Sequence, residues 1–178
     1  MSRLLPGPRT TPLAPVVGRA MVFGDHINTD LLHPSYFFSL DANTVQKGFL
    51  GAVEGREQAA SETRARVLLA GENFGCGSSR ETTMQALRLA GVQALVAVGF
   101  GRIFFRNALC LGLVAFTCPE AASLAEDGAR VEVDPIARVA RNLDTGRSVA
   151  LDPLDPFWQE VLEAGGMMPW LAARGSLP

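Results

Sequence analysis

The hydrophobic positions of this chain fall into short runs separated by glycine-rich and polar turns. Residues 16–23, 66–70, 94–98 and 113–116 are apolar runs that predict β-strands, the first of them buried. The run 94–98 (ALVAV) is apolar at every position, which is typical of a strand covered on both faces in a parallel sheet. The sequence therefore predicts a sheet with its core on two sides.

Helical patterns alternate with these strands. A helix is predicted to start near Arg80, with Met84, Leu87 and Ala90 on one face, and to stop at Gly91. Further helices are predicted over 101–111, over 42–50 with Asp41 as N-cap and an end near Gly51, and over 156–164 as the closing element. The alternation over about 66–116 predicts βαβ units with right-handed crossovers.

The pattern changes after Pro119. Residues 130–151 alternate in the manner of β-strands and are interrupted by turn-forming residues, which predicts a β-hairpin or meander. The expected fold is therefore an α/β domain with a mostly parallel central sheet and an antiparallel annex. We expect a single domain over 16–178, preceded by a flexible leader over 1–15 that carries four prolines.

Composition narrows the function classes. The chain has 178 residues, 48% of them hydrophobic and 19% charged, with a net charge of −2, so neither disorder nor a basic nucleic-acid surface is expected. No apolar run approaches the roughly 20 residues that span a bilayer, and no signal peptide is apparent, which predicts a cytoplasmic protein. The three cysteines, Cys76, Cys110 and Cys118, lack paired spacing, and with two histidines they predict neither a disulfide scaffold nor a metal site within this chain.

The segment 71–81 (GENFGCGSSRE) carries the clearest chemistry. Its glycines allow tight turns, and it leads into a helix N-terminus, where free N–H groups favour an anion. Ser78, Ser79 and Arg80 stand at that point, and an arginine binds a carboxylate through two parallel hydrogen bonds. The segment predicts a site for a carboxylate or phosphate; the alternative is an ordinary glycine-rich turn with serine caps that binds nothing. Neither a P-loop nor a dinucleotide-binding signature is present.

Three motifs in this order resemble a known family. Besides the segment 71–81, they are 24–30 (GDHINTD) and 102–108 (RIFFRNA). Together they resemble the swivelling domain of the aconitase superfamily, and most closely the small subunits of 3-isopropylmalate dehydratase. The resemblance extends over about residues 18–120 and implies a swivelling β/β/α domain of aconitase type.

The resemblance also implies a division of labour. Such a chain is one subunit of a heteromeric hydro-lyase, a heterodimer or heterotetramer, and is active only with a large subunit that holds a 4Fe–4S cluster. By similarity, Ser78 acts as the base, Ser79 and Arg80 bind a substrate carboxylate, and Asp30 orients the active-site hydrogen bonds. For Asp30 the alternative is a helix cap or turn residue. No cofactor is expected on this chain itself.

By the same resemblance, the segment 31–39 corresponds to the stretch that contacts the variable substituent of the substrate in this family. It lacks arginine and lysine, which favours an apolar substituent such as isopropyl, with Tyr36 and Phe37 as contacts. Phe37 and Phe38 are equally compatible with core packing. Arg102, Arg106 and His33 are candidates for supporting positions around the site, or surface groups. Thr82 stands where many family members have a histidine.

Two alternatives remain open from the sequence. The chain is compatible with another hydroxy diacid as substrate, such as homoaconitate, a methylmalate or a dimethylmalate. It is also compatible with a non-catalytic regulatory or binding module of the same fold. Neither nucleic acid nor a membrane is an expected partner.

Overall fold

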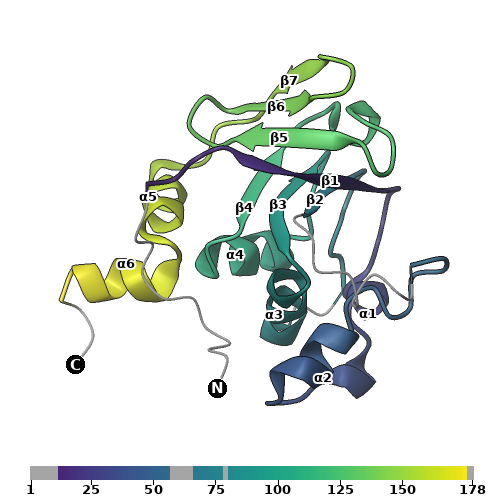
Figure 1. The fold of residues 1–178 in the computed structure, drawn as a ribbon. Coiled ribbons are helices and arrows are strands. Elements are labelled where there is room, and N and C mark those ends of the chain that lie inside the picture. Colours follow the sequence, from purple (N-terminus) through teal and green to yellow (C-terminus); the bar gives the residue numbers. More distant parts are fainter. Residues whose placement is uncertain (1–11, 57–65, 78–79, 176–178) are drawn as a thin grey trace.

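The computed structural model describes residues 12–56, 66–77 and 80–175, and these residues form a seven-stranded sheet in the order β4-β3-β2-β1-β5-β6-β7 (Figure 1). The strands β1 (Val16–Phe23), β2 (Arg66–Ala70), β3 (Val92–Ala97) and β4 (Val114–Thr117) pair in parallel. The strands β5 (Arg130–Asp134), β6 (Val139–Asn142) and β7 (Ser148–Ala150) continue the sheet in antiparallel pairing from β1. A parallel half and an antiparallel annex are thus both confirmed.

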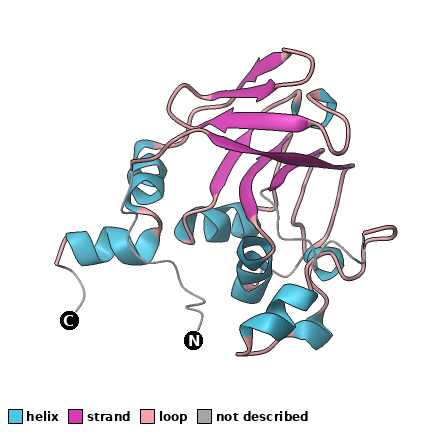
Figure 2. Ribbon diagram, viewed as in Figure 1, coloured by secondary structure: helices cyan, strands magenta, loops and turns pink. Residues whose placement is uncertain are grey.

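The helices of the described residues gather on one side of the sheet (Figure 2). They are α1 (Thr29–Leu32), α2 (Ala42–Lys47), α3 (Glu81–Leu89), α4 (Arg102–Cys110), α5 (Pro156–Ala164) and α6 (Met167–Ala173). Of two short 3-10 turns, η1 (Ser35–Phe37) lies next to α2, whereas η3 (Ala121–Ser123) lies apart from the α-helices and packs against the other face of β2 and β3. In the part of the chain that the structure describes, no helix has the length and apolar character needed to cross a bilayer.

Alternating residues of the parallel strands enter two different cores. In β2, Leu68 and Ala70 face a core shared with α3 and α4, whereas Val67 and Leu69 face the second core. That second core is closed by apolar residues of the antiparallel annex, among them Val131. Both faces of β2, β3 and β4 are therefore covered, which explains why these strands are rich in consecutive apolar residues.

The helices differ from the sequence prediction in two places: α2 is shorter than predicted, and α6 is an additional helix. The helix predicted over 42–50 ends at Lys47, because the backbone N–H of Leu50 donates to the carbonyl of Leu32 at 2.7 Å and turns the chain back into the core. Helix α6 was not predicted. Gly165 and Gly166 separate it from α5, and Pro169 lies in its first turn, where a missing N–H costs little.

The remaining boundaries shift by one or two residues, which is the usual uncertainty at element ends. The strand β1 has the predicted bounds but is not wholly buried, since 47% of Val17 is exposed. Leu13, within the segment predicted as a leader, is buried against the second core. Residues 1–11 lie outside the described part, so the predicted leader and domain boundaries stay predictions.

Candidate functional site

Three loops meet at the carboxyl ends of the parallel strands β1, β2 and β3. The backbone N–H of His26 donates to the carbonyl of Glu72 at 2.7 Å, which joins the loop after β1 to the loop after β2. The N–H of Gly101, at the start of α4, donates to the carbonyl of Phe74 at 2.9 Å. The three sequence motifs, although far apart in the chain, therefore form one hydrogen-bonded edge. In open α/β sheets this is the edge where ligands bind.

The close contact between the second and third loops depends on Gly75. Its φ is +74°, a left-handed conformation that L side chains rarely adopt, and a Cβ there would overlap the ring of Phe104. The neighbouring Phe74 is fully buried and meets Phe104 edge-on, with ring centroids 5.5 Å apart. The glycine thus lets the loop lie directly on α4.

Asp30 is positioned by a helix cap. The side-chain Oδ1 of Asn28 accepts hydrogen bonds from the N–H groups of Asp30, at 2.6 Å, and Leu31, at 3.4 Å. These bonds satisfy donors in the first turn of α1 and fix the start of that short helix. Asn28 therefore serves as the cap, and the Asp30 carboxylate remains available for another partner.

That partner is Arg80, at the N-terminus of α3. Arg80 Nη1 donates to Asp30 Oδ1 at 2.9 Å, and its guanidinium carbon lies 4.6 Å from the ring centroid of Phe38. The Arg80 side chain is 33% exposed and that of Asp30 is 59% exposed. The structure thus brings together two of the residues singled out in the sequence, at a position open to a ligand.

The two predicted site serines, Ser78 and Ser79, lie outside the described residues, so their roles stay predictions. The described chain reaches Gly77 on one side and resumes at Arg80, the residue before α3. The N–H groups of the first turn of α3 therefore begin directly after Arg80, and the helix dipole adds to the positive field of its guanidinium. This local field suits a carboxylate.

The aromatic residues of segment 31–39 have separate environments. Tyr36 is 72% exposed. Phe37 lies 4.6 Å from Tyr36 between ring centroids and packs over the turn at Gly48 and Gly51. Phe38, which was not singled out as a site residue, is the ring that contacts Arg80. The sequence offered only its place in an aromatic run, since the partner is 42 positions away.

His33 is buried and cannot touch a ligand directly. Its Nε2 lies 3.0 Å from the carbonyl oxygen of Val45, and because a carbonyl only accepts, Nε2 carries the proton of the neutral ring. Burial lowers the pKa of His33; the hydrogen bond to Val45 opposes that effect, and the Arg80 charge lowers the pKa further. His33 stacks on Phe38 with ring centroids 5.3 Å apart. It therefore contacts the ring that lies against Arg80.

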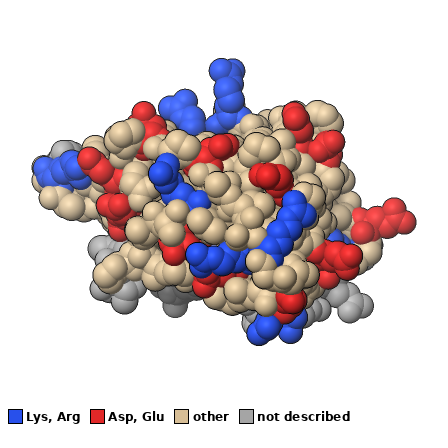
Figure 3. Space-filling view, turned by 90° about the horizontal axis from the view of Figure 1, so that it is seen from above, with Lys and Arg blue, Asp and Glu red and all other residues tan. Residues whose placement is uncertain are grey.

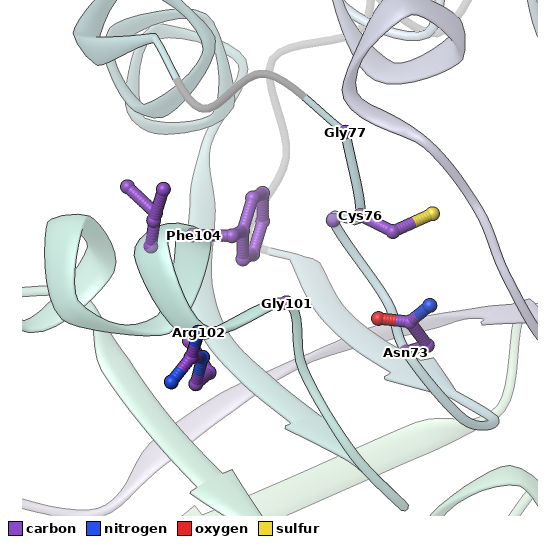
Figure 4. A pocket seen from close by; sticks show the side chains of 8 residues that line it. Asn73, Cys76, Gly77, Gly101, Arg102 and Phe104 are labelled. Atoms are coloured by element: carbon purple, nitrogen blue, oxygen red, sulfur yellow. The ribbon is translucent and has the colours of Figure 1, made fainter.

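Arg102 and Arg106 are both exposed on α4 and line a surface hollow of about 420 Å³ together with Ile103 and Phe105. A neighbouring pocket of about 230 Å³ lies between the loop 73–77 and the start of α4, with Asn73 and Cys76 on one side and Arg102 and Phe104 on the other (Figure 4). Exposed arginines beside the three joined loops extend the positive field of this edge.

The thiols do not form a ligand set. Cys76 is half-buried, with Sγ 3.5 Å from the carbonyl oxygen of His26, and Cys118 is buried in the second core. Cys110 is half-buried. Among the described residues, no group of three His, Cys, Asp or Glu side chains is placed to hold a metal ion.

The distribution of charge on the opposite end of the molecule is mixed. On the face seen in Figure 3, acidic and basic side chains are interspersed. The ion pair between Arg141 and Glu132, at 2.7 Å, joins the neighbouring strands β6 and β5. A surface of alternating sign lacks the continuous positive field that attracts a nucleic-acid backbone.

Comparison with known proteins identifies similar chains. Residues 33–121 match the family model of the aconitase C-terminal domain. The chain is 41% identical to 3-isopropylmalate dehydratase small subunit 1 of Methanopyrus kandleri over 89% of this chain and 93% of the relative. It is 38% identical to the 3-isopropylmalate dehydratase small subunit of Moorella thermoacetica over 89% and 96% of the two chains.

A solved structure agrees with these sequence matches. The crystal structure of 3-isopropylmalate dehydratase from Methanocaldococcus jannaschii superimposes with a TM-score of 0.83 at 30% identity. It covers 90% of this chain and 95% of that one. The similarity therefore extends over most of both chains.

Proposed function

This chain belongs to the family of 3-isopropylmalate dehydratase small subunits, which are aconitase-type hydro-lyase subunits, and we propose that it acts on isopropylmalate together with a large subunit. The reaction interconverts 2-isopropylmalate and 3-isopropylmalate by dehydration and rehydration, a step of leucine biosynthesis. The observation that carries the proposal is the junction of the three motif loops, which leaves Arg80 exposed beside the N-terminus of α3.

The proposed large subunit holds the 4Fe–4S cluster and assembles with this chain as a heterodimer or heterotetramer. When bound, such a cluster supplies a Lewis acid for the departing hydroxyl group. The described residues of this chain offer no cluster of metal ligands, and its candidate site lies open at one edge of the sheet. This division of labour predicts that the isolated chain has no dehydratase activity.

Within this chain, Arg80 is proposed to bind a substrate carboxylate. A guanidinium has five N–H donors in a fixed planar fork, and in the described part of the chain one of its nitrogens, Nη1, is engaged by Asp30. The other donors suit a carboxylate in a bidentate arrangement. Asp30 is proposed to hold Arg80 in the orientation that makes this possible.

Ser78 is proposed to remove the proton next to the bound carboxylate, with Ser79 as a further hydrogen-bond donor to substrate. A serine hydroxyl is a weak base unless its alkoxide is stabilised. The start of α3 and the Arg80 guanidinium provide positive charge close to Ser78 in the chain, which supports this assignment.

The proposed substrate carries an apolar substituent. The segment around α1 and η1 exposes Leu31, Tyr36 and Leu40, which are 37%, 72% and 95% exposed. Such side chains favour contact with an isopropyl group over a third carboxylate, which would need a cation for compensation. Tyr36 and Phe37 are the proposed contacts, with His33, Arg102 and Arg106 in supporting positions. We place this activity in the cytoplasm, without nucleic-acid or membrane partners.

The proposal is tested by co-expressing the chain with a large subunit, assembling the cluster anaerobically, and measuring dehydration of 3-isopropylmalate by the absorbance of the unsaturated product. Turnover is expected only with both subunits. Ser78→Ala should abolish it, whereas Ser148→Ala, which changes an exposed serine on β7, should not.

The other outcomes separate the alternatives. A complex that ignores isopropylmalate and turns over homoaconitate or a methylmalate would keep the family and replace the substrate. Activity of the isolated chain would contradict the division between subunits. A complex with no turnover on any hydroxy diacid would favour a non-catalytic module.

A further inference from the structure

We propose that Phe38 is a positioning residue for Arg80, and that buried His33 holds Phe38 in place. The inference rests on the proposed function, because it assigns a role in orienting the carboxylate-binding arginine. It is carried by three contacts that connect the core to the site: His33 with Phe38, Phe38 with Arg80, and Arg80 with Asp30.

The ion pair alone does not hold Arg80. Both of its side chains are substantially exposed, and exposed ion pairs typically contribute only about 0–1 kcal/mol. A long arginine side chain with one such partner samples several rotamers. The Phe38 ring adds a second contact in a different direction, because the guanidinium carbon lies over the ring face at 4.6 Å from its centroid.

Two contacts in different directions restrict the plane of the guanidinium. The carboxylate of Asp30 engages Nη1, and the central carbon of the guanidinium lies over the ring of Phe38, so the group is held at two separate points. A bidentate complex with a carboxylate requires the two planes to coincide. Fixing the guanidinium plane before binding therefore lowers the entropy lost when substrate arrives.

Phe38 is itself supported from the core. Its ring stacks on His33 with an interplanar angle of 25°, and His33 is fully buried with Nε2 bonded to the Val45 carbonyl. Behind His33, Gly48 has no side chain, and a Cβ there would overlap the imidazole. The helix α2 and the turn that follows it thus fix the imidazole, and the imidazole supports the ring under Arg80.

The first test uses the isolated chain and needs no turnover. In nitrogen–proton NMR spectra, the guanidinium signals of Arg80 should be shifted upfield by the ring current of Phe38. Phe38→Leu should remove that shift, and Phe38→Tyr, which keeps the ring, should restore it. His33→Leu, which removes the stacked neighbour, should reduce it. Arg80 signals that are unchanged in Phe38→Leu would overturn the proposal, and unchanged signals in His33→Leu would remove His33 from it.

Circular dichroism establishes that each variant is folded, and Phe38→Met is a second ring-free variant if the leucine variant does not fold. The matched control is Trp170→Leu, which removes the aromatic partner of another arginine contact, Arg174 over Trp170 at 3.9 Å on α6. It should leave the Arg80 signals unchanged.

The second test uses the reconstituted complex. Phe38→Leu should raise KM about tenfold, with kcat changed by less than about threefold, because it removes orientation of a binding group, and Phe38→Tyr should restore KM. A loss confined to kcat, or a rise in KM that the tyrosine does not reverse, would contradict a positioning role. A wild-type complex that does not act on isopropylmalate would refute the proposed function, while the NMR result would still decide the role of Phe38.

Discussion

Asp30 and Arg80 are separated by 50 positions in the chain and form an ion pair with 2.9 Å between Oδ1 and Nη1. The pair links helix α1 to the N-terminus of α3, so two motifs that resemble those of one family share a direct contact. Because each side chain is partly exposed to solvent, the ion pair is expected to contribute little to the free energy of unfolding and to act mainly by orienting the Arg80 side chain.

Asp30→Asn should therefore damage activity far more than stability. Loss of the carboxylate leaves Arg80, the proposed carboxylate-binding group, with one fewer restraint, and a small misplacement of such a group costs about a hundredfold in rate. We expect kcat/KM of the reconstituted complex to fall about 10- to 100-fold, with a free energy of unfolding lowered by no more than about 1 kcal/mol. Steady-state kinetics and urea denaturation measure the two quantities.

The control for Asp30→Asn is Glu132→Gln, which breaks the exposed Arg141–Glu132 pair on the annex. The two changes have the same chemistry, and only the first lies at the candidate site. Similar activity losses in both variants, or no loss in Asp30→Asn, would contradict the assignment of Asp30.

Asn28→Ala should affect both stability and activity, because Asn28 caps the helix that carries Asp30. Loss of an N-cap costs about 0.5–2 kcal/mol, and Asn28→Ser, which keeps a capping oxygen, should recover most of it. The control that separates stability from activity is Asp155→Ala. It removes the N-cap of α5, whose carboxylate accepts a hydrogen bond from the backbone N–H of Phe157. That variant should lose similar stability in thermal denaturation and retain full kcat/KM; a parallel loss in both variants would make the Asn28 effect purely structural.

Much of this architecture was predictable because the signals are local. The apolar runs, Asp41 as a helix cap and the turn residues of the annex each act within a few positions, and the strands, α5 and the meander follow from them. Helix α6 was missed for the same reason, since Gly165 and Gly166 followed by Pro169 resemble the end of a structure. The order of the strands in the sheet depends on long-range packing instead.

The motifs named most of the residues of the candidate site, but they did not predict all of the contacts between those residues. The motifs singled out Asp30 and Arg80, and the structure brings these two side chains into contact, while their roles toward a substrate stay predictions. The contact of Phe38 with Arg80 was not predictable, because neighbouring Phe37 has the same side chain and only the backbone at η1 decides which ring faces the site. Burial of His33 likewise depends on the approach of Gly48.

Gly75→Ala should destabilise the chain by about 2–4 kcal/mol, which combines a left-handed φ with overpacking against Phe104. Gly146→Ala is the matched control: its φ is +78°, close to the +74° of Gly75, and no atom lies within 4 Å of the place that a methyl group would take. It should cost about 1 kcal/mol, the conformational part alone. Urea denaturation measures the free energy of unfolding of both variants, and the difference between their losses gives the part that is due to the overlap with Phe104. Equal losses in the two variants would show that the Phe104 ring moves aside without an energetic penalty.

The stability of the chain should fall as the pH is lowered through the ordinary pKa range of histidine, because the folded chain binds a proton at His33 less readily than the unfolded chain does. Burial lowers its pKa below the usual value of about 6.5 that it has in the unfolded chain. Between the folded and unfolded pKa values, the unfolded chain therefore binds the extra proton. The free energy of unfolding is expected to fall with decreasing pH in this window, by at most about 1.4 kcal/mol per pH unit for one proton.

His33→Gln keeps a side-chain donor for the Val45 carbonyl but cannot titrate, so its free energy of unfolding should depend less on pH between 5 and 7. Ordinary carboxyl groups titrate below about pH 5, outside this window. Urea denaturation at several pH values measures the slopes; a His33→Gln variant as pH-dependent as the wild type would mean that another group, and not the imidazole behind Phe38, takes up the proton.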